Sequence, residues 1–274
     1  MKNQRTSLSG HWSLLTSKYS IFLVLIAMII ISSIISPVFL SLTNFSNISR
    51  QISITTILAF GQTILIICGL IDLSAGSVMA LAGLISVMFF KSTGMMGAAL
   101  AIGVFVGVGC GIINGLVVTK FKTPPFIATL AMLTAARGAA LMLTGGQNIY
   151  QLGDFVVWGQ GAVLGVPTPV LFLIGITAVT WYLLNHTRLG RYIYAIGGNI
   201  VAAEVSGVNV QRNLVKIYMY AGMLAGVAGL VLSGRLNTGQ PGMGVAYELD
   251  AIAATTIGGT SHSGGIGTIQ GAVV

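Results

Sequence analysis

The sequence predicts an all-α protein whose helices cross a membrane as a bundle. Its composition points to this fold, because 55% of the 274 residues are hydrophobic and only 7% are charged. Water-soluble domains are about one quarter charged. The apolar residues also gather in runs of roughly 20, the length that a helix needs to cross a bilayer.

Seven apolar runs are long enough to be spans. In chain order they cover residues 20–40, 52–71, 74–90, 95–119, 124–144, 168–184 and 217–232. The first run follows a polar, basic tail at residues 1–18, which we expect to be cytoplasmic. This run is too long for a signal-peptide core and lacks a small-residue cleavage site. We therefore expect an uncleaved first span and one membrane domain over residues 19–274.

The last stretch, residues 248–274, is apolar and rich in glycine. It predicts a re-entrant half-helix that leads into an eighth span. The sequence stops at Val274 within this apolar stretch, without the polar or basic residues that anchor the end of a span. We expect further spans beyond it.

The basic residues predict the orientation, because cytoplasmic loops of membrane proteins are enriched in Lys and Arg. With the N-terminus in the cytoplasm, the residues on the inner side are Lys2, Arg5, Lys18, Lys120, Lys122, Arg188, Arg191, Arg212 and Lys216. Those outside are Arg50, Lys91 and Arg235. The net charge of +8 does not indicate nucleic acid, because the basic residues form no stripe with interleaved aromatics.

Small residues recur at a helical spacing in two of the predicted spans. They are Gly103, Gly107, Gly111 and Gly115 in one, and Gly222 and Gly226 in the other. A spacing of four stacks such residues on one helical face, where two backbones can approach closely. The pattern fits close helix packing, and it also fits an interface that moves.

Three ionisable residues lie at or near membrane depth, where they are costly and need a reason. Asp72 and Asp250 each precede small residues that open a helix, so each fits either a helix cap or a role along a solute pathway. The similarity of the two strings around them hints at an internal repeat, as transport folds have. Arg137, within a span, fits either a snorkelling side chain or a partner of an acid.

The sequence contains no catalytic set. No cluster of His, Cys and carboxylates has metal-ligand spacing, and no G-x-x-x-x-G-K-[ST] phosphate loop occurs. We expect no metal, no cofactor and no enzymatic activity. An ion-coupled carrier needs carboxylates or histidines within its spans, and only Asp72 and Asp250 are available, at segment edges. A carrier of this kind, working alone, remains the alternative to a subunit powered by a partner.

The longest polar interruption covers residues 188–216. Within it, Ile200–Val205 predicts a short helix, because Asn199 is a favourable N-cap and Gly207 a favourable stop. A short capped helix too polar for the membrane is suited to a partner's groove. The alternative is a plain surface loop.

Four strings of the sequence resemble one family. They are IDLSAGSVMALAG (71–83), NGLVVTKFKTPPFIATLAMLTAARG (114–138), GRYIYAIGGNIVAAEVSGVNV (190–210) and YELDAIAATTIGGTSHSGGIGTIQG (247–271). From about residue 39 onward the chain resembles the permease subunit of bacterial ATP-binding-cassette (ABC) importers for sugars. These are the ribose, xylose and autoinducer type of the branched-chain-permease superfamily.

The resemblance implies an inner-membrane permease subunit that carries a sugar or sugar-like solute. The implied partners are ABC ATPase subunits, a periplasmic sugar-binding protein, a second permease subunit in a homo- or heterodimer, and membrane lipid. The implied ATPase-coupling residues are Gly198, Asn199, Ala202, Ala203, Glu204, Ser206 and Gly207. The residues implied along the translocation path are Asp72, Ser74, Asn114, Phe126 and Asp250.

Overall fold

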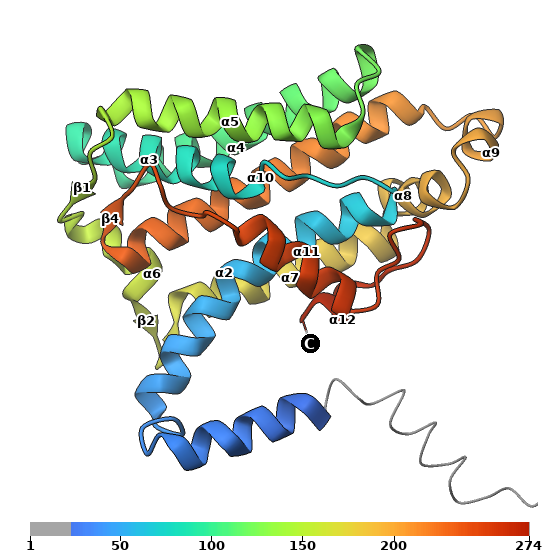
Figure 1. Ribbon diagram of the computed structural model, residues 1–274. Coiled ribbons are helices and arrows are strands. Elements are labelled where there is room, and N and C mark those ends of the chain that lie inside the picture. The colour runs from blue at the N-terminus through green and yellow to red at the C-terminus, as the bar shows by residue number, and fades with distance from the viewer. Residues whose placement is uncertain (1–22, 274) are drawn as a thin grey trace, which may run out of the picture. The chain divides into compact units, whose positions relative to one another are not determined.

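The computed structural model describes residues 23–273 (Figure 1). Six of its helices are long and apolar enough to cross a membrane. They are α2 (Leu42–Ile67), α3 (Ala75–Thr93), α4 (Met96–Lys120), α5 (Pro125–Thr144), α7 (Thr168–His186) and α10 (Val210–Leu236). The predicted bundle of transmembrane helices is therefore confirmed, and each of these helices contains or largely overlaps one predicted span.

The remaining elements are short. The helical ones are the 3-10 turn η1 (Gly153–Val156), α6 (Val157–Gln160), α8 (Arg188–Gly198), α9 (Ile200–Val205), α11 (Tyr247–Ile257) and α12 (Ile269–Val273). Four two-residue strands form two antiparallel pairs: β1 (Ile149–Tyr150) with β4 (Thr238–Gly239), and β2 (Ala162–Val163) with β3 (Val166–Pro167). In the first pair, Ile149 lies opposite Gly239.

The chain divides into two compact units, the first ending at Ile48. The described part of the first unit has a helix over Leu23–Ile35, which ends before Ser36 and Pro37 because the residue preceding a proline disfavours helical backbone. The predicted first span therefore ends five residues early. Its opening residues and the tail at 1–18 lie outside the described residues.

Helix ends in the second unit follow local signals. Helices α3 and α5 stop at Gly94 and Gly145, both with left-handed backbone. Helix α5 begins at Pro125, the position where a missing N–H costs nothing. Helix α10 is longer than its apolar run, because the Asn209 side chain caps its start by accepting from the N–H of Arg212 at 3.0 Å.

The core of the second unit lies where α2, α3 and α10 pack together. Ile57 and Phe60 of α2, Met79 of α3 and Tyr218 of α10 are fully buried. Helix α10 also runs beside α4 (Figure 1). Most residues of α4, α5 and α7 are exposed or only partly buried, as a bundle in hydrocarbon allows.

The predicted glycine seam joins α4 to α10. A Cβ on Gly107 would meet the Gly222 carbonyl oxygen, and a Cβ on Gly111 would meet that of Tyr218. Gly115 lies against the Cα of Val215. The spacing of these residues thus reflects close backbone packing, the first of the two interpretations of the sequence.

Candidate translocation path and coupling segment

Two segments of non-helical backbone lie against membrane-length helices in the second unit. The first, residues 68–74, joins α2 to α3. The second follows α10 and runs along α3: Gly239 packs on Leu84 and Val87, Met243 reaches Gly83, and Gly244 meets Gly76. Such backbone at membrane depth is tolerated only where protein or a polar cavity satisfies it, and broken helices of this kind line the solute sites of many transporters.

Asp72 and Ser74 form the centre of the first segment. One Asp72 carboxylate oxygen accepts from the Ser74 N–H at 2.7 Å and from the Ser74 hydroxyl at 2.6 Å. The Asn114 amide of α4 donates to the same hydroxyl at 2.9 Å. All three side chains are buried. The structure therefore brings together three of the five residues assigned to the path.

The backbone of this segment is tied to two further helices. Gln62 of α2 donates to the Asp72 carbonyl at 2.5 Å, and Thr129 of α5 accepts from the Leu73 N–H at 3.2 Å. A carboxylate that accepts a hydrogen bond from the backbone N–H two residues later forms a turn. Here the turn ends where α3 begins. The geometry of Asp72 is thus that of a residue that holds the start of α3.

Phe126 and Asp250 are not part of this cluster. Phe126 lies in the first turn of α5 with 56% of its surface exposed, and Asp250 is exposed in the first turn of α11. Asp72 precedes its helix and is buried, whereas Asp250 is inside its helix and exposed. The similarity of the two strings is therefore not matched by equivalent positions.

Among residues 23–273, Arg137 bonds backbone carbonyl oxygens and forms no ion pair with a carboxylate. Its guanidinium donates to the carbonyl oxygens of Pro241 and of Met243, the latter at 2.7 Å. These carbonyls belong to the second non-helical segment. The arginine thus satisfies backbone acceptors that an extended chain leaves free at membrane depth.

Glu248 is a site residue that the sequence analysis missed. It is half-buried in the first turn of α11, and its carboxylate lies against Gly76 in the first turn of α3, where only a glycine leaves room. Its position as one of only five acids, two residues before Asp250, was the available signal.

Helix α11 is held on α2 by buried threonines. The Thr255 hydroxyl donates to the Ala59 carbonyl at 3.1 Å and lies 3.3 Å from the Thr63 hydroxyl. At about 1.5 Å per residue, the 11 residues of α11 are too few to cross about 30 Å of hydrocarbon. This short length agrees with the predicted half-helix.

The predicted coupling segment has the local structure that its residues indicated. Helix α9 covers Ile200–Val205, the Asn199 side chain accepts from the Ala202 N–H at 2.9 Å, and Gly207 has left-handed backbone with φ +84°. Ala203 is buried against the core. The other six predicted coupling residues are exposed: Gly198, Asn199, Ala202, Glu204, Ser206 and Gly207.

Three apolar side chains of α9 face outward. Val205 is 85% exposed, Val201 64% and Ile200 48%. Exposed apolar residues on a short, firmly capped helix are typical of a surface that another protein covers. This favours docking over the plain-loop alternative.

Helix α8 connects α9 to the end of α2 and to the loop after α11. The Tyr194 hydroxyl donates to the Gly267 carbonyl at 2.8 Å, and the Gly265 N–H donates to the Ile67 carbonyl at the end of α2 at 2.8 Å. Gly197 of α8 packs directly on that carbonyl and on Gly265. Movement of α8 would therefore reach both the end of α2 and the loop after α11.

Comparison with known proteins agrees with this arrangement. A family model described as "Branched-chain amino acid transport system / permease component" matches residues 44–274. The ribose import permease protein of Bacillus subtilis (strain 168) is 43% identical over 267 residues, 96% of this chain and 83% of that protein. No solved structure matches the chain.

Further relatives include the ribose import permease protein of Escherichia coli (strain K12), 40% identical over 257 residues, 91% of this chain and 79% of that protein. The D-allose transport system permease protein of the same strain is 35% identical over 267 residues, 96% of this chain and 82% of that protein. A permease component is one part of a larger transport system, which supports the subunit reading over the carrier that works alone. The chain is a multi-pass membrane protein and belongs to the branched-chain amino acid transport system permease family.

Proposed function

We propose that the chain is the permease subunit of an ATP-driven importer, which translocates a sugar or sugar-like solute delivered by a periplasmic binding protein. The observation that carries this proposal is the similarity, over nine-tenths or more of the chain, to permeases named for ribose and allose. The chain itself is then non-catalytic, and separate ATPase subunits supply the work. A second permease subunit, identical or different, completes the pathway.

The polar residues 188–216 and the N-terminus both lie on the cytoplasmic side of the membrane. The distribution of Lys and Arg supports this orientation. It places α9 where cytoplasmic ATPase subunits can bind it. The coupling residues are Gly198, Asn199, Ala202, Ala203, Glu204, Ser206 and Gly207.

The solute passes near the two non-helical segments. An uncharged solute suits a pathway with few charges and with hydroxyl and amide side chains. Asp72, Ser74 and Asn114 hold the wall of the pathway, and Phe126 and Asp250 extend it through their exposed surfaces. The contacts of Asp72 with Ser74 support a wall-forming role for it rather than a direct contact with solute.

Coupling follows a mechanical route through this chain. When the ATPase subunits close, they displace α9, and α8 moves with it because Asn199 alone separates the two helices. The contacts of α8 with Ile67 and with residues 265–267 then carry the displacement to the end of α2, beside the first non-helical segment, and to the loop after α11. Their shift changes which side of the membrane the pathway faces.

Uptake into proteoliposomes tests the proposal. The permease is reconstituted with its ATPase and binding protein, and labelled ribose, allose and galactose are supplied on the binding-protein side. We expect uptake of a sugar only with ATP and both partners. Uptake driven by a proton or sodium gradient, with the permease alone, would refute the proposal and restore the self-sufficient carrier.

Glu204 tests the coupling surface separately. Glu204→Lys places a cation on the exposed face of α9, and we expect weaker co-purification of the ATPase subunit while the permease still unfolds at the same temperature. Asp154→Lys is the matched control, because Asp154 is also an exposed acid but lies in the loop between α5 and α7. If the ATPase subunit co-purifies with Glu204→Lys as well as it does with Asp154→Lys, α9 does not bind the ATPase subunit.

A further inference from the structure

A groove lies between the end of α4 and the start of α10, outside the path and the coupling segment. It has a volume of about 440 Å³ and is lined by Leu116, Thr119 and Lys120 of α4 and by Gln211, Arg212, Val215 and Lys216 of α10. We call it the basic groove. Three of its seven lining residues are cations, and they come from both helices.

The charge of the basic groove is uncompensated. None of the chain's five acids lines it. Among residues 23–273, the side chains of Lys120, Arg212 and Lys216 have no ion pair or hydrogen bond within the chain. Three cations held around one concave surface favour an anionic ligand, and the oxygens of a phosphate accept charge-assisted hydrogen bonds from both lysine and arginine.

Part of the lining of the basic groove is apolar, and we call this part its floor. Leu116 and Val215 form it, and the close approach of Gly115 to Val215 fixes the two helices against each other. One to two turns nearer the middle of the two helices, Ile113 and Met219 are exposed on the same flank, at 52% and 37%. A ligand with a charged headgroup and an apolar chain would place the headgroup against the cations and the chain along these apolar side chains.

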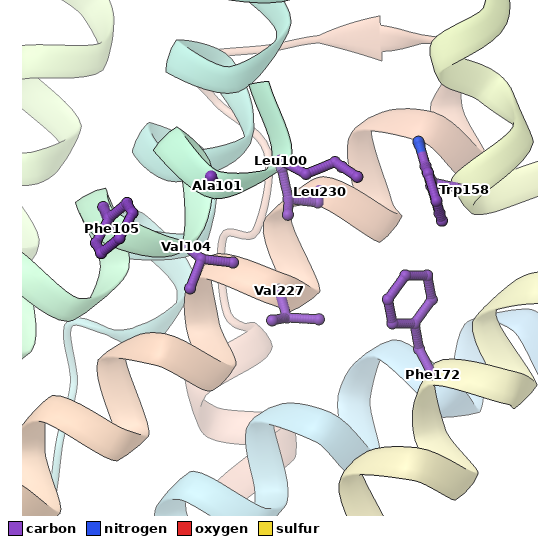
Figure 2. Close-up of a pocket in the computed structure, with 8 residues that line it drawn as sticks. All are labelled: Leu100, Ala101, Val104, Phe105, Trp158, Phe172, Val227 and Leu230. Carbon is purple, nitrogen blue, oxygen red and sulfur yellow. The ribbon is translucent and has the colours of Figure 1, made fainter. Parts of the chain in front are cut away.

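The far end of the same α4–α10 pair carries a second, wholly apolar pocket. Figure 2 shows Leu100 and Val104 of α4 facing Val227 and Leu230 of α10, with Trp158 and Phe172 closing one side. The one polar group among its lining side chains is the indole N–H of Trp158, which donates to the Met96 sulfur at 3.1 Å. The flank of the helix pair is therefore apolar from this pocket toward the basic groove, as a lipid-facing surface must be.

We propose that the basic groove binds the phosphate headgroup of an anionic phospholipid, whose acyl chain lies along the apolar flank of α4 and α10. The continuity of the groove with that flank favours a lipid over an acidic protein surface, which would find cations but leave the exposed Ile113 and Met219 uncovered. Basic pockets between transmembrane helices bind such headgroups. The assignment needs only that the helices span a membrane, so it stands apart from the proposed solute and energy source.

Retention of lipid by the purified full-length permease tests the proposal. The protein is extracted, exchanged into mixed phosphatidylglycerol and phosphatidylcholine, and its bound lipids are identified by native mass spectrometry. We expect retained phosphatidylglycerol in preference to phosphatidylcholine. No preference between the two lipids in the unmodified protein would overturn the proposal without any variant.

The groove is then tested with two variants of equal charge. Lys120→Gln with Lys216→Gln removes two groove cations, and we expect affinity for phosphatidylglycerol to fall about 25-fold, at about fivefold for each cation. Arg188→Gln with Arg191→Gln removes two exposed cations of α8 and should leave retention unchanged. Equal losses in both would show diffuse attraction to a positive face, and would refute a groove site.

Two further outcomes identify a different occupant. If the Lys120 and Lys216 variant keeps its phosphatidylglycerol but no longer co-purifies with the ATPase subunit, the cations serve a protein partner and the lipid assignment is wrong. If excess inorganic phosphate releases the lipid completely, the apolar floor contributes nothing and the site is one for a soluble anion. Retention that resists phosphate supports the lipid.

Discussion

Asp72 shows how a single acid near membrane depth can be satisfied without a cation. Its carboxylate accepts from both the N–H and the hydroxyl of Ser74, and Asn114 completes the group. The carboxyl group thereby holds a turn between two helices. The sequence left a cap and a pathway role equally open, and these contacts favour the first as the primary role.

Replacement of Asp72 separates the two roles. Asp72→Ala leaves the buried Ser74 N–H without an acceptor, which costs about 1–3 kcal/mol of unfolding free energy and should lower the thermal unfolding temperature in detergent. Asp72→Asn keeps one acceptor oxygen and should lose less. Asp154→Ala, at an exposed acid, is the control. An unchanged unfolding temperature combined with lost uptake would show that Asp72 acts on the solute instead.

Arg137 illustrates a cation that serves backbone rather than an acid. We expect Arg137→Ala to leave the Pro241 and Met243 carbonyls without donors, which lowers the free energy of unfolding by about 1–3 kcal/mol for each buried group. Arg137→Lys should restore only part of this free energy, because lysine lacks the planar guanidinium that donates to both carbonyls. The thermal unfolding temperature and the rate of uptake should fall together.

Arg191→Ala, at an exposed arginine of α8, is the matched control for Arg137. If Arg137→Ala unfolds at the same temperature as this control, the bonds to Pro241 and Met243 do not hold the second non-helical segment in place.

At the scale of elements, the α4–α10 seam is what fixes the bundle. Gly107→Ala would drive a Cβ into the Gly222 carbonyl, and forcing extra volume into a packed interface costs about 1–3 kcal/mol. Gly109→Ala is an internal control, because a Cβ at Gly109 meets nothing within 4 Å. We expect the first variant to unfold at a lower temperature and the second to be neutral or slightly more stable.

The same comparison tests whether the seam moves. If Gly107→Ala keeps its stability but slows ATP-driven uptake, α4 and α10 slide past each other during transport. The close packing of the two helices is then only one of their arrangements. If neither stability nor uptake changes, Gly107 and Gly222 do not pack closely enough to exclude a methyl group.

Some elements were predictable because their signals are local. Asn199 and Gly207 defined α9 to the residue, and the apolar runs located every membrane-length helix described. Helix α10 and the start of α2 extend four to ten residues beyond the apolar runs, because polar turns continue a helix once a cap or a neighbouring helix satisfies them. The carbonyl partners of Arg137 and the contact of Glu248 with Gly76 were not predictable, since each joins residues more than 100 positions apart in the sequence.

For the whole molecule, the structure connects the exposed helix α9 to the end of α2 and to the loop after α11. Helix α9 presents apolar side chains outward, α8 follows it, and α8 contacts the end of α2 and the loop after α11. None of these contacts requires a catalytic group in this chain. This arrangement supports the proposal that separate proteins, bound on one side of the membrane, open and close the pathway through this chain.

The side on which α9 lies tests that account most directly. In a variant without Cys68 and Cys110, a single cysteine is placed at Val205, which is 85% exposed, or at Leu164, which is fully exposed in the loop between α5 and α7. A membrane-impermeant thiol reagent added to intact cells should label Leu164→Cys and leave Val205→Cys unlabelled until the membrane is opened. Labelling of Val205→Cys from outside intact cells would place α9 beyond the reach of any cytoplasmic ATPase and contradict the account.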